Sequence, residues 1–264
     1  MSRGRSARVL ARRLGDAGAS DLGRRPDEVV EEEPLEIRLD DHLVATTMRT
    51  PGHDFELAVG FCFTEGLLAG APVLTCRYCG TGPAAETEFN VVSVDTGGAA
   101  PEPLPRLGLT SSACGICGTT QLDDLLLRLE PLPAFEPWDP RVLFAVTEHV
   151  REAQDLFART GAAHAAASFD REGAIGVVRE DIGRHNAVDK VVGRLLLDGA
   201  MPATGHGLFV SGRASFEMVQ KAWAAGFEAL VAVSAPSGLA VRTATTAGLT
   251  LAGFVRGTDF NLYT

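Results

Sequence analysis

The sequence of 264 residues lacks an excess of positive charge. Lysine and arginine together number 24, against 34 aspartates and glutamates, so the formal net charge is −10. Such a chain has no global positive field that would attract a polyanion, and we expect no binding to nucleic acid. Any contact with a nucleotide must therefore be local. Only Lys190 and Lys221 are lysines, a bias that we attribute mainly to genome composition.

Long hydrophobic runs are also missing. The longest stretch without charge, Leu107 to Leu122, is short and is interrupted by serine, glycine and threonine. It cannot span a bilayer, which takes ~20 apolar residues. The arginine-rich start is not followed by an apolar block, which argues against a secretory signal. We therefore expect a cytoplasmic protein that does not contact a membrane.

No repeat of fixed period is visible, and the composition is that of a globular chain. Hydrophobic residues make up 45% and charged residues 22%, which is enough apolar material to bury a real core. The length allows one large domain or two modest ones, on a prior of ~100–200 residues per domain.

The pattern along the chain divides it into three parts. Residues 1–26 are rich in Arg, Gly, Ala and Ser, and we expect a mobile N-terminal segment with one short strand around Arg8–Leu10. The pattern over residues 27–134 predicts a smaller, β-rich region. Its expected elements are extended segments over Glu28–Leu39, His42–Met48 and Glu88–Asp95, and an amphipathic helix over Asp54–Leu68 with Asp54 as its N-cap and His53 beside it.

Residues 135–264 follow a proline-rich boundary and alternate strands with helices. Such alternation with short links is typical of a layered α/β sheet, and the chain as a whole is predicted to be α/β, or α+β overall. The expected elements are a long helix over Pro140–Thr160, strands His164–Phe169 and Gly173–Arg179, helix Arg184–Leu197, strand Gly207–Ser211, helix Ala214–Ala225, strand Ala229–Ser234, helix Ser237–Gly248 and strand Leu249–Val255.

Four of the five cysteines form two C-x-x-C pairs, Cys76 with Cys79 and Cys114 with Cys117. In a reducing compartment such pairs bind metal or perform catalysis. Cys114 and Cys117 are flanked by glycines and precede helix-forming residues, so the dipole of the following helix would favour the thiolate. Disulfide exchange, metal ligation and persulfide relay all fit this pair. Cys62 lies on the apolar face of an expected helix and is assigned to the core.

A structural zinc site of four cysteines is the alternative reading of the two pairs. The segment between Cys79 and Cys114 is longer than the ~15–20 residues usual for such sites. We therefore expect no permanently bound metal. A thioredoxin-like oxidoreductase is disfavoured as well, because the second pair follows a Pro/Gly-rich loop and not the first strand of a βαβ unit.

Two links that follow expected strands carry polar groups, and such links are where α/β sheets bind ligands. In Asp181–Lys190, the side chains of His185, Asn186 and Lys190 could read a nucleotide; alternatively, Asp181 and Asn186 cap the helix and Asp189 pairs with Arg184 or Lys190. Ser211 and Arg213 begin a second link, of the kind that receives a phosphate. It lacks the P-loop spacing, so NTP hydrolysis is not indicated. Ser234–Gly238 repeats this geometry weakly, and we read it as a turn with an N-cap serine.

Six ordered blocks resemble one family. They are Glu33–Arg38, Met48–Ala58 with Thr64–Gly66, Ser111–Gly118, Glu180–Lys190, Ser211–Arg213 and Gly253–Gly257. Together they resemble the formate dehydrogenase accessory sulfurtransferases (FdhD/NarQ) from about residue 28 to the C-terminus.

The resemblance implies a sulfurtransferase that accepts a persulfide from a cysteine desulfurase. The sulfur would pass to the molybdenum bis(molybdopterin guanine dinucleotide) cofactor, bound as substrate, for the activity of formate dehydrogenase. Cys114 would carry the persulfide with Cys117 as its partner, in a homodimer that binds guanine nucleotide moieties. The family also implies a cytidine-deaminase-like C-terminal domain. Deamination is not expected, because His164-Ala165-Ala166 lacks the required glutamate. The pair Cys76/Cys79 departs from the family, so either a metal-binding role or a second relay role stays open for it.

The guanine dinucleotide is expected to contact the C-terminal segment, predicted as a loop after the strand Leu249–Val255. Arg256 can fork onto a phosphate, Gly257 allows close approach and Asp259 can accept from guanine. Phe254 either stacks on a ring or fills the core, and we favour the core. The alternative is a surface tail in which Arg256 and Asp259 pair. The expected cofactor-binding residues are Phe254, Val255, Arg256, Gly257, Thr258, Asp259, Ser211, Arg213 and His185.

Overall fold

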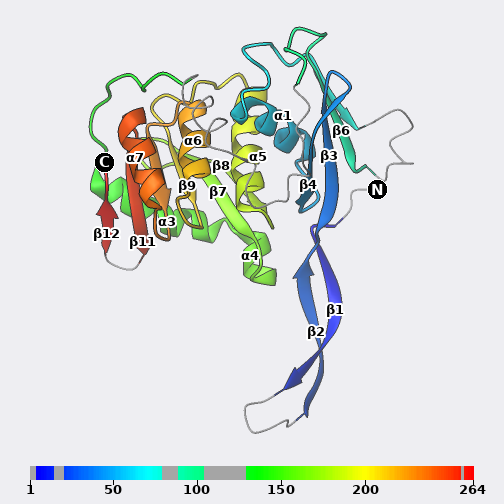
Figure 1. The fold of residues 1–264 in the computed structure, drawn as a ribbon. Coiled ribbons are helices and arrows are strands. Elements are labelled where there is room, and N and C mark those ends of the chain that lie inside the picture. Colours follow the sequence, from blue (N-terminus) through cyan, green and yellow to red (C-terminus); the bar gives the residue numbers. More distant parts are fainter. Residues whose placement is uncertain (1–3, 15–20, 79–88, 104–128, 257–258) are drawn as a thin grey trace.

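A computed structural model describes residues 4–14, 21–78, 89–103, 129–256 and 259–264 (Figure 1). Strands β1 (Ser6–Leu14) and β2 (Asp21–Val30) pair antiparallel along their length and project from the body as an arm (Figure 1). The strand predicted around Arg8–Leu10 lies within β1, which is longer than expected, and the part of β2 before Glu28 was not predicted. The strand face of this segment is not buried, so its sequence need not alternate apolar and polar residues. Arginines interrupt its apolar residues, and the usual strand pattern is therefore missing.

A four-stranded sheet follows the arm. It has the order β4-β3-β6-β5 and is formed by β3 (Glu33–Leu39), β4 (His42–Arg49), β5 (Thr75–Tyr78) and β6 (Val91–Asp95). The alternation seen in the sequence explains β3, since Leu35, Ile37 and Leu39 are fully buried and the residues between them are not. Helix α1 (Asp54–Thr64) packs on this sheet through Leu57, Ala58 and Cys62. The predicted helix thus ends four residues early, and β5 was not predicted.

The C-terminal part is a six-stranded sheet between helices. Its order is β12-β11-β10-β9-β7-β8. The strands are β7 (His164–Phe169), β8 (Ile175–Asp181), β9 (Gly207–Val210), β10 (Ala229–Ala232), β11 (Thr250–Arg256) and β12 (Asp259–Leu262), and the helices are α3 (Pro140–Glu152), α4 (Asp155–Thr160), α5 (Arg184–Leu197), α6 (Phe216–Ala224) and α7 (Gly238–Ala247). The prediction of a mixed α/β fold is confirmed.

Strand direction places four strand ends at one edge of this sheet. Strands β9, β10 and β11 are parallel. Strand β7 runs antiparallel to both β8 and β9, so β8 points the same way as β9 to β11. Helices α5, α6 and α7 pack on one face of the sheet and α3 on the other (Figure 1). We call the edge where β8, β9, β10 and β11 end the carboxyl edge.

Two boundaries differ from the sequence prediction. The helix expected over Pro140–Thr160 breaks into α3 and α4, because the carboxylate of Glu180 accepts hydrogen bonds from the backbone N–H groups of Leu156 (2.9 Å) and Phe157 (2.8 Å) and so starts a new helix. At the C-terminus, the expected loop is a hairpin. Strand β11 continues to Arg256, and β12 returns antiparallel to it.

Helices α1 and α5 connect the two sheets by close contact. A Cβ atom on Gly60 would lie 1.8 Å from the backbone oxygen of Asp189, and one on Gly193 would lie 1.8 Å from that of Glu56. Only glycine at these positions lets the helices approach so closely.

The division into units 1–26, 27–134 and 135–264 stays a prediction.

Candidate functional site

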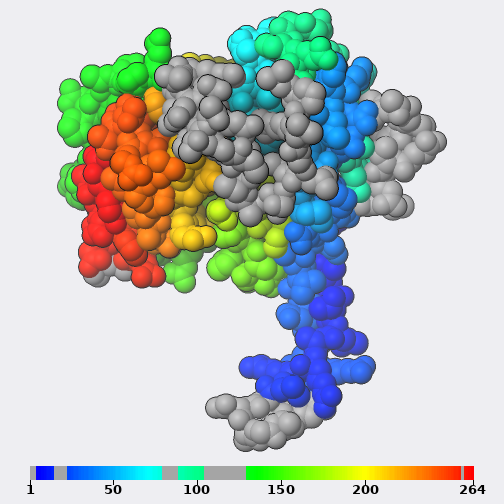
Figure 2. All heavy atoms as spheres, in the orientation of Figure 1, coloured from blue at the N-terminus to red at the C-terminus, as the bar shows by residue number. Residues whose placement is uncertain are grey.

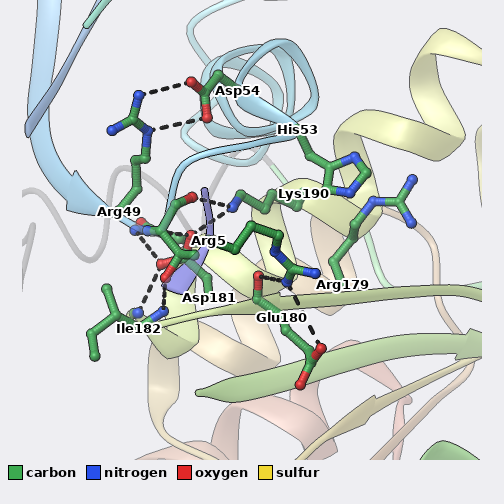
Figure 3. Close-up of polar contacts among 12 residues, drawn as sticks. Arg5, Arg49, His53, Asp54, Arg179, Glu180, Asp181, Ile182 and Lys190 are labelled. Carbon is green, nitrogen blue, oxygen red and sulfur yellow. Dashed lines mark hydrogen bonds and ion pairs between the residues drawn. The ribbon is translucent and has the colours of Figure 1, made fainter. Parts of the chain in front are cut away.

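A buried polar network joins the end of β4 to the link between β8 and α5 (Figure 3). The backbone N–H of Thr50 donates to Asp181 Oδ2 (3.1 Å), and the N–H of Ile182 donates to Thr50 Oγ1 (3.0 Å). Lys190 Nζ lies 2.7 Å from Asp181 Oδ2 and donates to the Thr50 carbonyl (3.0 Å). Asp181 and Lys190 have no exposed surface. Lys190 therefore holds the fold together, and its burial leaves it unavailable to a nucleotide.

Asn186, in the same link, is structural in the same way. Asn186 Nδ2 donates to the carbonyl of Met48 (2.8 Å) and to Asp181 Oδ1 (3.0 Å). Asp181 Oδ1 also accepts from the N–H of Gly183, the N-cap residue of α5. Asp181 thus contacts the start of α5 and binds the distant segment at Thr50. The alternative expectation that Asp181 and Asn186 cap the helix was wrong, because Gly183 is the N-cap and the Asn186 amide donates to Met48 and Asp181.

Asp189 has a partner that the sequence did not indicate. Its carboxylate lies 2.9 Å from Lys221 Nζ in α6 and accepts a hydrogen bond from Thr64 Oγ1 (2.8 Å) in α1. The expected pairing with Arg184 or Lys190 was therefore wrong. Burial favours a lower pKa for Lys221, but the carboxylates of Asp189 and Glu65 outweigh burial and raise that pKa, so the ammonium stays charged.

Asp54 and His53 do not cap α1 with their side chains. Asp54 receives two hydrogen bonds from the buried Arg49 guanidinium, at 3.1 and 2.8 Å (Figure 3). His53 occupies the N-cap position with a left-handed backbone (φ 57°) and makes no side-chain cap bond. Its ring is 40% exposed, with Nδ1 3.5 Å from Glu56 Oε2. The expectation that Asp54 is the N-cap was wrong, because pairing with a buried arginine takes up its carboxylate.

Three predicted segments are joined in series along the carboxyl edge. The carbonyl of Gly212 accepts from the N–H of Ser234 (3.3 Å), and the carbonyl of Ser234 accepts from the N–H of Phe254 (3.2 Å). The Ala214 carbonyl accepts from the N–H of Ser237 (3.0 Å), and Ser237 caps α7 as the sequence predicted. The links after β9 and β10 and the end of β11 therefore form one continuous surface.

The predicted residues of the β9 link differ in their availability. Ser211 Oγ accepts a hydrogen bond from the N–H of Ala165 (2.9 Å) and so holds β7 against β9. Arg213 is exposed beside it. The guanidinium of Arg213 can therefore reach an anion, whereas the hydroxyl of Ser211 is already engaged by the fold.

A cluster of polar groups lies where this surface meets the start of α5. The buried atoms Arg184 Nε, His185 Nε2 and Ser215 Oγ have no hydrogen-bond partner among the described residues. Burial, and then the positive charges of Arg184 and Lys221, lower the pKa of His185 to about 4, so its ring is neutral at pH 7. Neutral imidazole, hydroxyl and guanidinium groups together can hydrogen-bond an anionic or polar ligand.

His164 joins this cluster, although sequence reasoning considered it only as a missing deaminase motif. It stands opposite Asp181 in the β7–β8 register, and its ring lies near Gly212, at 3.7 Å from a Cβ built there. Burial and the charge of Arg184 lower its pKa. The antiparallel direction of β7 brings the first residue of that strand to the carboxyl edge. Arg184 and Ser215 were visible in the predicted links but were not selected.

The C-terminal segment lies at the far end of the same edge. Phe254 is half-buried and has a left-handed backbone (φ 56°), a strained conformation for a residue with a side chain. Val255 is fully buried in the core. Arg256 and Asp259 stand opposite each other across the β11–β12 hairpin. Gly257 and Thr258 lie outside the described residues.

Cys114, Cys117 and Cys79 also lie outside the described residues, so their roles stay predictions. Cys76 lies in β5 opposite Val94, and burial raises its pKa to about 12. Cys62 is fully buried in the core between α1 and the four-stranded sheet, as predicted. Within the described ranges, no three His, Cys, Asp or Glu side chains are grouped to hold a metal ion. None of the helices found there is long and apolar enough to cross a membrane.

Comparison with known proteins identifies the family. The chain is 47% identical over 252 residues to the sulfur carrier protein FdhD of Corynebacterium efficiens, covering 92% of this chain and 91% of that protein. It is 44% identical over 263 residues to the protein of that name from Mycobacterium tuberculosis, covering 96% and 95%.

A solved structure shares the fold. A candidate formate dehydrogenase accessory protein from Desulfotalea psychrophila superposes with a TM-score of 0.79 at 23% identity, covering 99% of this chain and 98% of that one. The sequence profile of the FdhD/NarQ family matches residues 30–264. With a match over most of its length and relatives well above 40% identity, the chain belongs to the FdhD/NarQ family.

Proposed function

We propose that this protein is a sulfurtransferase that carries sulfur as a persulfide on Cys114. A thiolate at Cys114 attacks the terminal sulfur of a persulfide on a cysteine desulfurase, and the desulfurase cysteine leaves as a thiolate. The terminal sulfur then passes from Cys114 to the molybdenum bis(molybdopterin guanine dinucleotide) cofactor, bound as substrate. In this step the Cys117 thiolate attacks the inner sulfur of the Cys114 persulfide, so that the terminal sulfur leaves at the sulfide level for the cofactor and a Cys114–Cys117 disulfide remains, which a cellular dithiol then reduces. Formate dehydrogenase receives the sulfurated cofactor.

The observation that best supports a large polar substrate is the carboxyl edge. Its three chain links are hydrogen-bonded to one another, and Arg184 Nε, His185 Nε2 and Ser215 Oγ end there without a hydrogen-bond partner among the described residues, although Glu217 Oε2 lies 4.0 Å from His185 Nε2. Buried polar atoms without partners are costly, so they favour a ligand that completes them. A dinucleotide with phosphates and a guanine ring supplies both acceptors and donors.

The naming of the relatives supports the sulfur chemistry. Proteins that match this chain over about nine-tenths of their length are called sulfur carriers. The two C-x-x-C pairs suit a reducing compartment, and we place the protein in the cytoplasm.

A zinc-binding interaction module is the competing function. It requires four thiolates, one of them Cys76. Burial in β5 raises the pKa of Cys76 to about 12, so its surroundings favour the neutral thiol. Metal analysis of anaerobically purified protein decides between them, since stoichiometric zinc that is lost in both Cys76→Ala and Cys114→Ala would establish the module.

Peptide mass spectrometry tests the carrier directly. The purified protein is incubated with a cysteine desulfurase and cysteine, alkylated and digested. We expect the mass of one added sulfur atom on the peptide that contains Cys114, and none on the peptide that contains Cys62. Cys62→Ala is the matched control variant and should still be loaded. A peptide from the wild-type protein that never gains sulfur at Cys114 would refute the proposal.

A further inference from the structure

Polar side chains gather at the part of the carboxyl edge where β8 and β9 end. His164 Nδ1 and Arg184 Cδ lie 3.7 and 3.9 Å from a Cβ atom built at Gly212, so the two side chains flank this glycine. His185 follows Arg184 in the first turn of α5, and Ser215 is the N-cap residue of α6, a helix in contact with α5. We call His164, Arg184, His185 and Ser215 the polar cluster.

Three buried atoms of the polar cluster can bind a ligand. Arg184 Nε, His185 Nε2 and Ser215 Oγ have no hydrogen-bond partner among the described residues. Ser215 makes no cap bond to α6, although serine at this position usually accepts one from a backbone N–H. Glu217 Oε2 lies 4.0 Å from His185 Nε2, beyond the length of a hydrogen bond. Since unpaired buried polar atoms are costly, the three atoms favour a small ligand that hydrogen-bonds to them.

The charges around the polar cluster suit a ligand with one negative charge. Four cations and four carboxylates lie around it: Arg184, Lys190, Arg213 and Lys221, and Glu65, Asp181, Asp189 and Glu217. These charges cancel, so they leave no positive surplus to balance a doubly charged ion. The free energy needed to bury an ion also rises steeply with its charge. A single negative charge in contact with the Arg184 guanidinium is therefore favoured over two.

The two histidines can bind an anion without protonating it. Burial, and then the positive charge of Arg184, lower the pKa of His164. Burial, and then the charges of Arg184 and Lys221, lower the pKa of His185 to about 4. A neutral imidazole donates a hydrogen bond but holds its own proton firmly. The anion of a weak acid would therefore keep its charge in the polar cluster.

The release step proposed for the cysteine pair produces such an anion. When the Cys117 thiolate attacks the inner sulfur of the Cys114 persulfide (–S–SH), a Cys114–Cys117 disulfide forms and the bond to the terminal sulfur breaks. The electron pair of that bond leaves with the terminal sulfur, which becomes hydrosulfide with one negative charge. Free hydrosulfide takes up a proton in water and escapes as hydrogen sulfide. Transfer without loss therefore requires a site that holds the ion away from water.

We propose that the polar cluster holds hydrosulfide between its release from Cys114 and its uptake by the molybdenum cofactor. The inference rests on the proposed function and assigns sulfur to one end of the carboxyl edge. The nucleotide is expected at the C-terminal segment, and the ends of β8 and β11 are four strand positions apart, about 19 Å at ~4.8 Å per strand. The C-terminal strands (red) lie on the side of the body away from the arm (Figure 2), and α5 lies nearer the arm (Figure 1).

Heteronuclear NMR of the histidine side chains tests this binding without a persulfide on Cys114. The reduced full-length protein is titrated with sodium hydrosulfide under anaerobic conditions at constant pH and ionic strength. We expect saturable shifts of the His164 and His185 ring nitrogens and no shift of the exposed His206. An absence of saturable shifts at His164 and His185 would overturn the proposal.

Two variants and a matched control locate the ion. Arg184→Gln should weaken hydrosulfide binding at least about tenfold and Ser215→Ala about threefold, since each removes a hydrogen-bond donor. Arg194→Gln, at an exposed arginine in the last turn of the same helix, should bind as the wild type does. Ser215→Ala breaks no hydrogen bond among the described residues, so it remains informative if Arg184→Gln does not fold. Wild-type affinity in the folded variants would overturn the proposal.

Competing ions test the charge of the ligand. Thiocyanate, a monoanion that does not modify thiols, should displace hydrosulfide, whereas sulfate, a dianion, should not at the same ionic strength. GDP should leave the hydrosulfide shifts unchanged, because it is expected at the C-terminal segment. Displacement by sulfate or by GDP at a lower concentration than by thiocyanate would overturn the proposal and assign the polar cluster to a phosphate of the nucleotide.

Sulfide escape connects the site with transfer. Protein loaded at Cys114 by a cysteine desulfurase is separated from the desulfurase and cysteine, and free sulfide is followed with a sulfide-selective electrode. Ser215→Ala and Arg184→Gln should be loaded as the wild type is but should release sulfide into solution sooner. The same rate of escape in variants and wild type would overturn the hydrosulfide site. A wild type that binds hydrosulfide but never gains sulfur at Cys114 would support the site and refute the proposed function.

Discussion

Gly60 of α1 and Gly193 of α5 face each other where the two helices cross, and neither has room for a Cβ atom. The nearest backbone oxygens would lie 1.8 Å from a Cβ at either position. Because α1 packs on the four-stranded sheet and α5 on the six-stranded sheet, this contact joins the two sheets. It also places Thr50, which follows β4, next to the carboxyl edge. The placement of the candidate site therefore depends on the close contact at these two glycines.

Gly60→Ala and Gly193→Ala should each destabilise the protein by more than ~3 kcal/mol, because the helices must move apart to admit a methyl group. Chemical denaturation measures the free energy of unfolding. Gly238→Ala in α7 is the matched control, since a Cβ there meets only an arginine side chain at 3.7 Å. It should change stability by less than ~1 kcal/mol. Equal effects of the three substitutions would contradict the helix contact.

The ion pair of Glu56 with Arg179 predicts a loss of stability in acid. Burial opposes ionisation of Glu56, but hydrogen bonds from Arg179 and His53 outweigh it and lower the pKa from 4.5 to about 2. A lowered carboxyl pKa stabilises the fold above pH 4.5, and this stabilisation is lost as the pH falls to about 2. Its size is roughly 3 kcal/mol.

Glu56→Gln therefore should unfold at lower denaturant than the wild type at pH 7, and the difference should shrink as the pH falls toward 2. Denaturation curves at a series of pH values measure this. Glu148→Gln, at an exposed residue of α3, should leave the curves unchanged. If the difference in stability between Glu56→Gln and the wild type stays constant with pH, the carboxylate charge is not its cause.

The two lysines of the chain should resist amine-directed reagents. Lys190 has no exposed surface and Lys221 has 3%, and each is paired with an aspartate. In the native protein, a succinimidyl ester should modify only the N-terminal amine on the time scale in which exposed lysines react, whereas in denaturant all three amines should react. Mass spectrometry counts the modified sites. Fast native labelling of Lys221 would contradict its burial between α1, α5 and α6.

Arg256 tests whether the C-terminal segment at the carboxyl edge binds a nucleotide, as proposed. If the guanidinium binds a phosphate of the dinucleotide, Arg256→Ala should weaken GDP binding by roughly 1.5–3 kcal/mol, the value of a lost charged hydrogen bond. Calorimetric titration measures the affinity, and ADP should bind poorly. Arg151→Ala in α3, an exposed arginine on the opposite face of the sheet, should bind GDP normally. Unchanged affinity in Arg256→Ala would remove this residue from the site.

Periodicity predicted the regular elements of the C-terminal half well, as the bounds of β7 and α5 show. It failed where tertiary contacts decide. The break between α3 and α4 depends on Glu180 in a distant strand, and the arm has no buried face that would impose a pattern on its sequence. Local spacing also assigned Asp54 to a cap, although the buried Arg49 binds it.

The candidate site was predicted in part, for a similar reason. Links after parallel strands must meet at one edge, so Ser211, Ser234 and Phe254 could be grouped before their positions were known. Which polar groups are free there could not be read from the sequence. Lys190 and Ser211 are engaged by the fold, whereas His164 reaches the site only because β7 runs antiparallel to its neighbours.

The central claim is that Cys114 carries the sulfur that formate dehydrogenase needs. Its most direct test is the formate dehydrogenase activity of cells in which the chromosomal copy of this protein is replaced by Cys114→Ala, with Cys76→Ala as the matched control. The account predicts that the Cys114→Ala cells contain formate dehydrogenase with its molybdenum cofactor but little activity, and that the Cys76→Ala cells keep theirs. Full activity in the Cys114→Ala cells would contradict it.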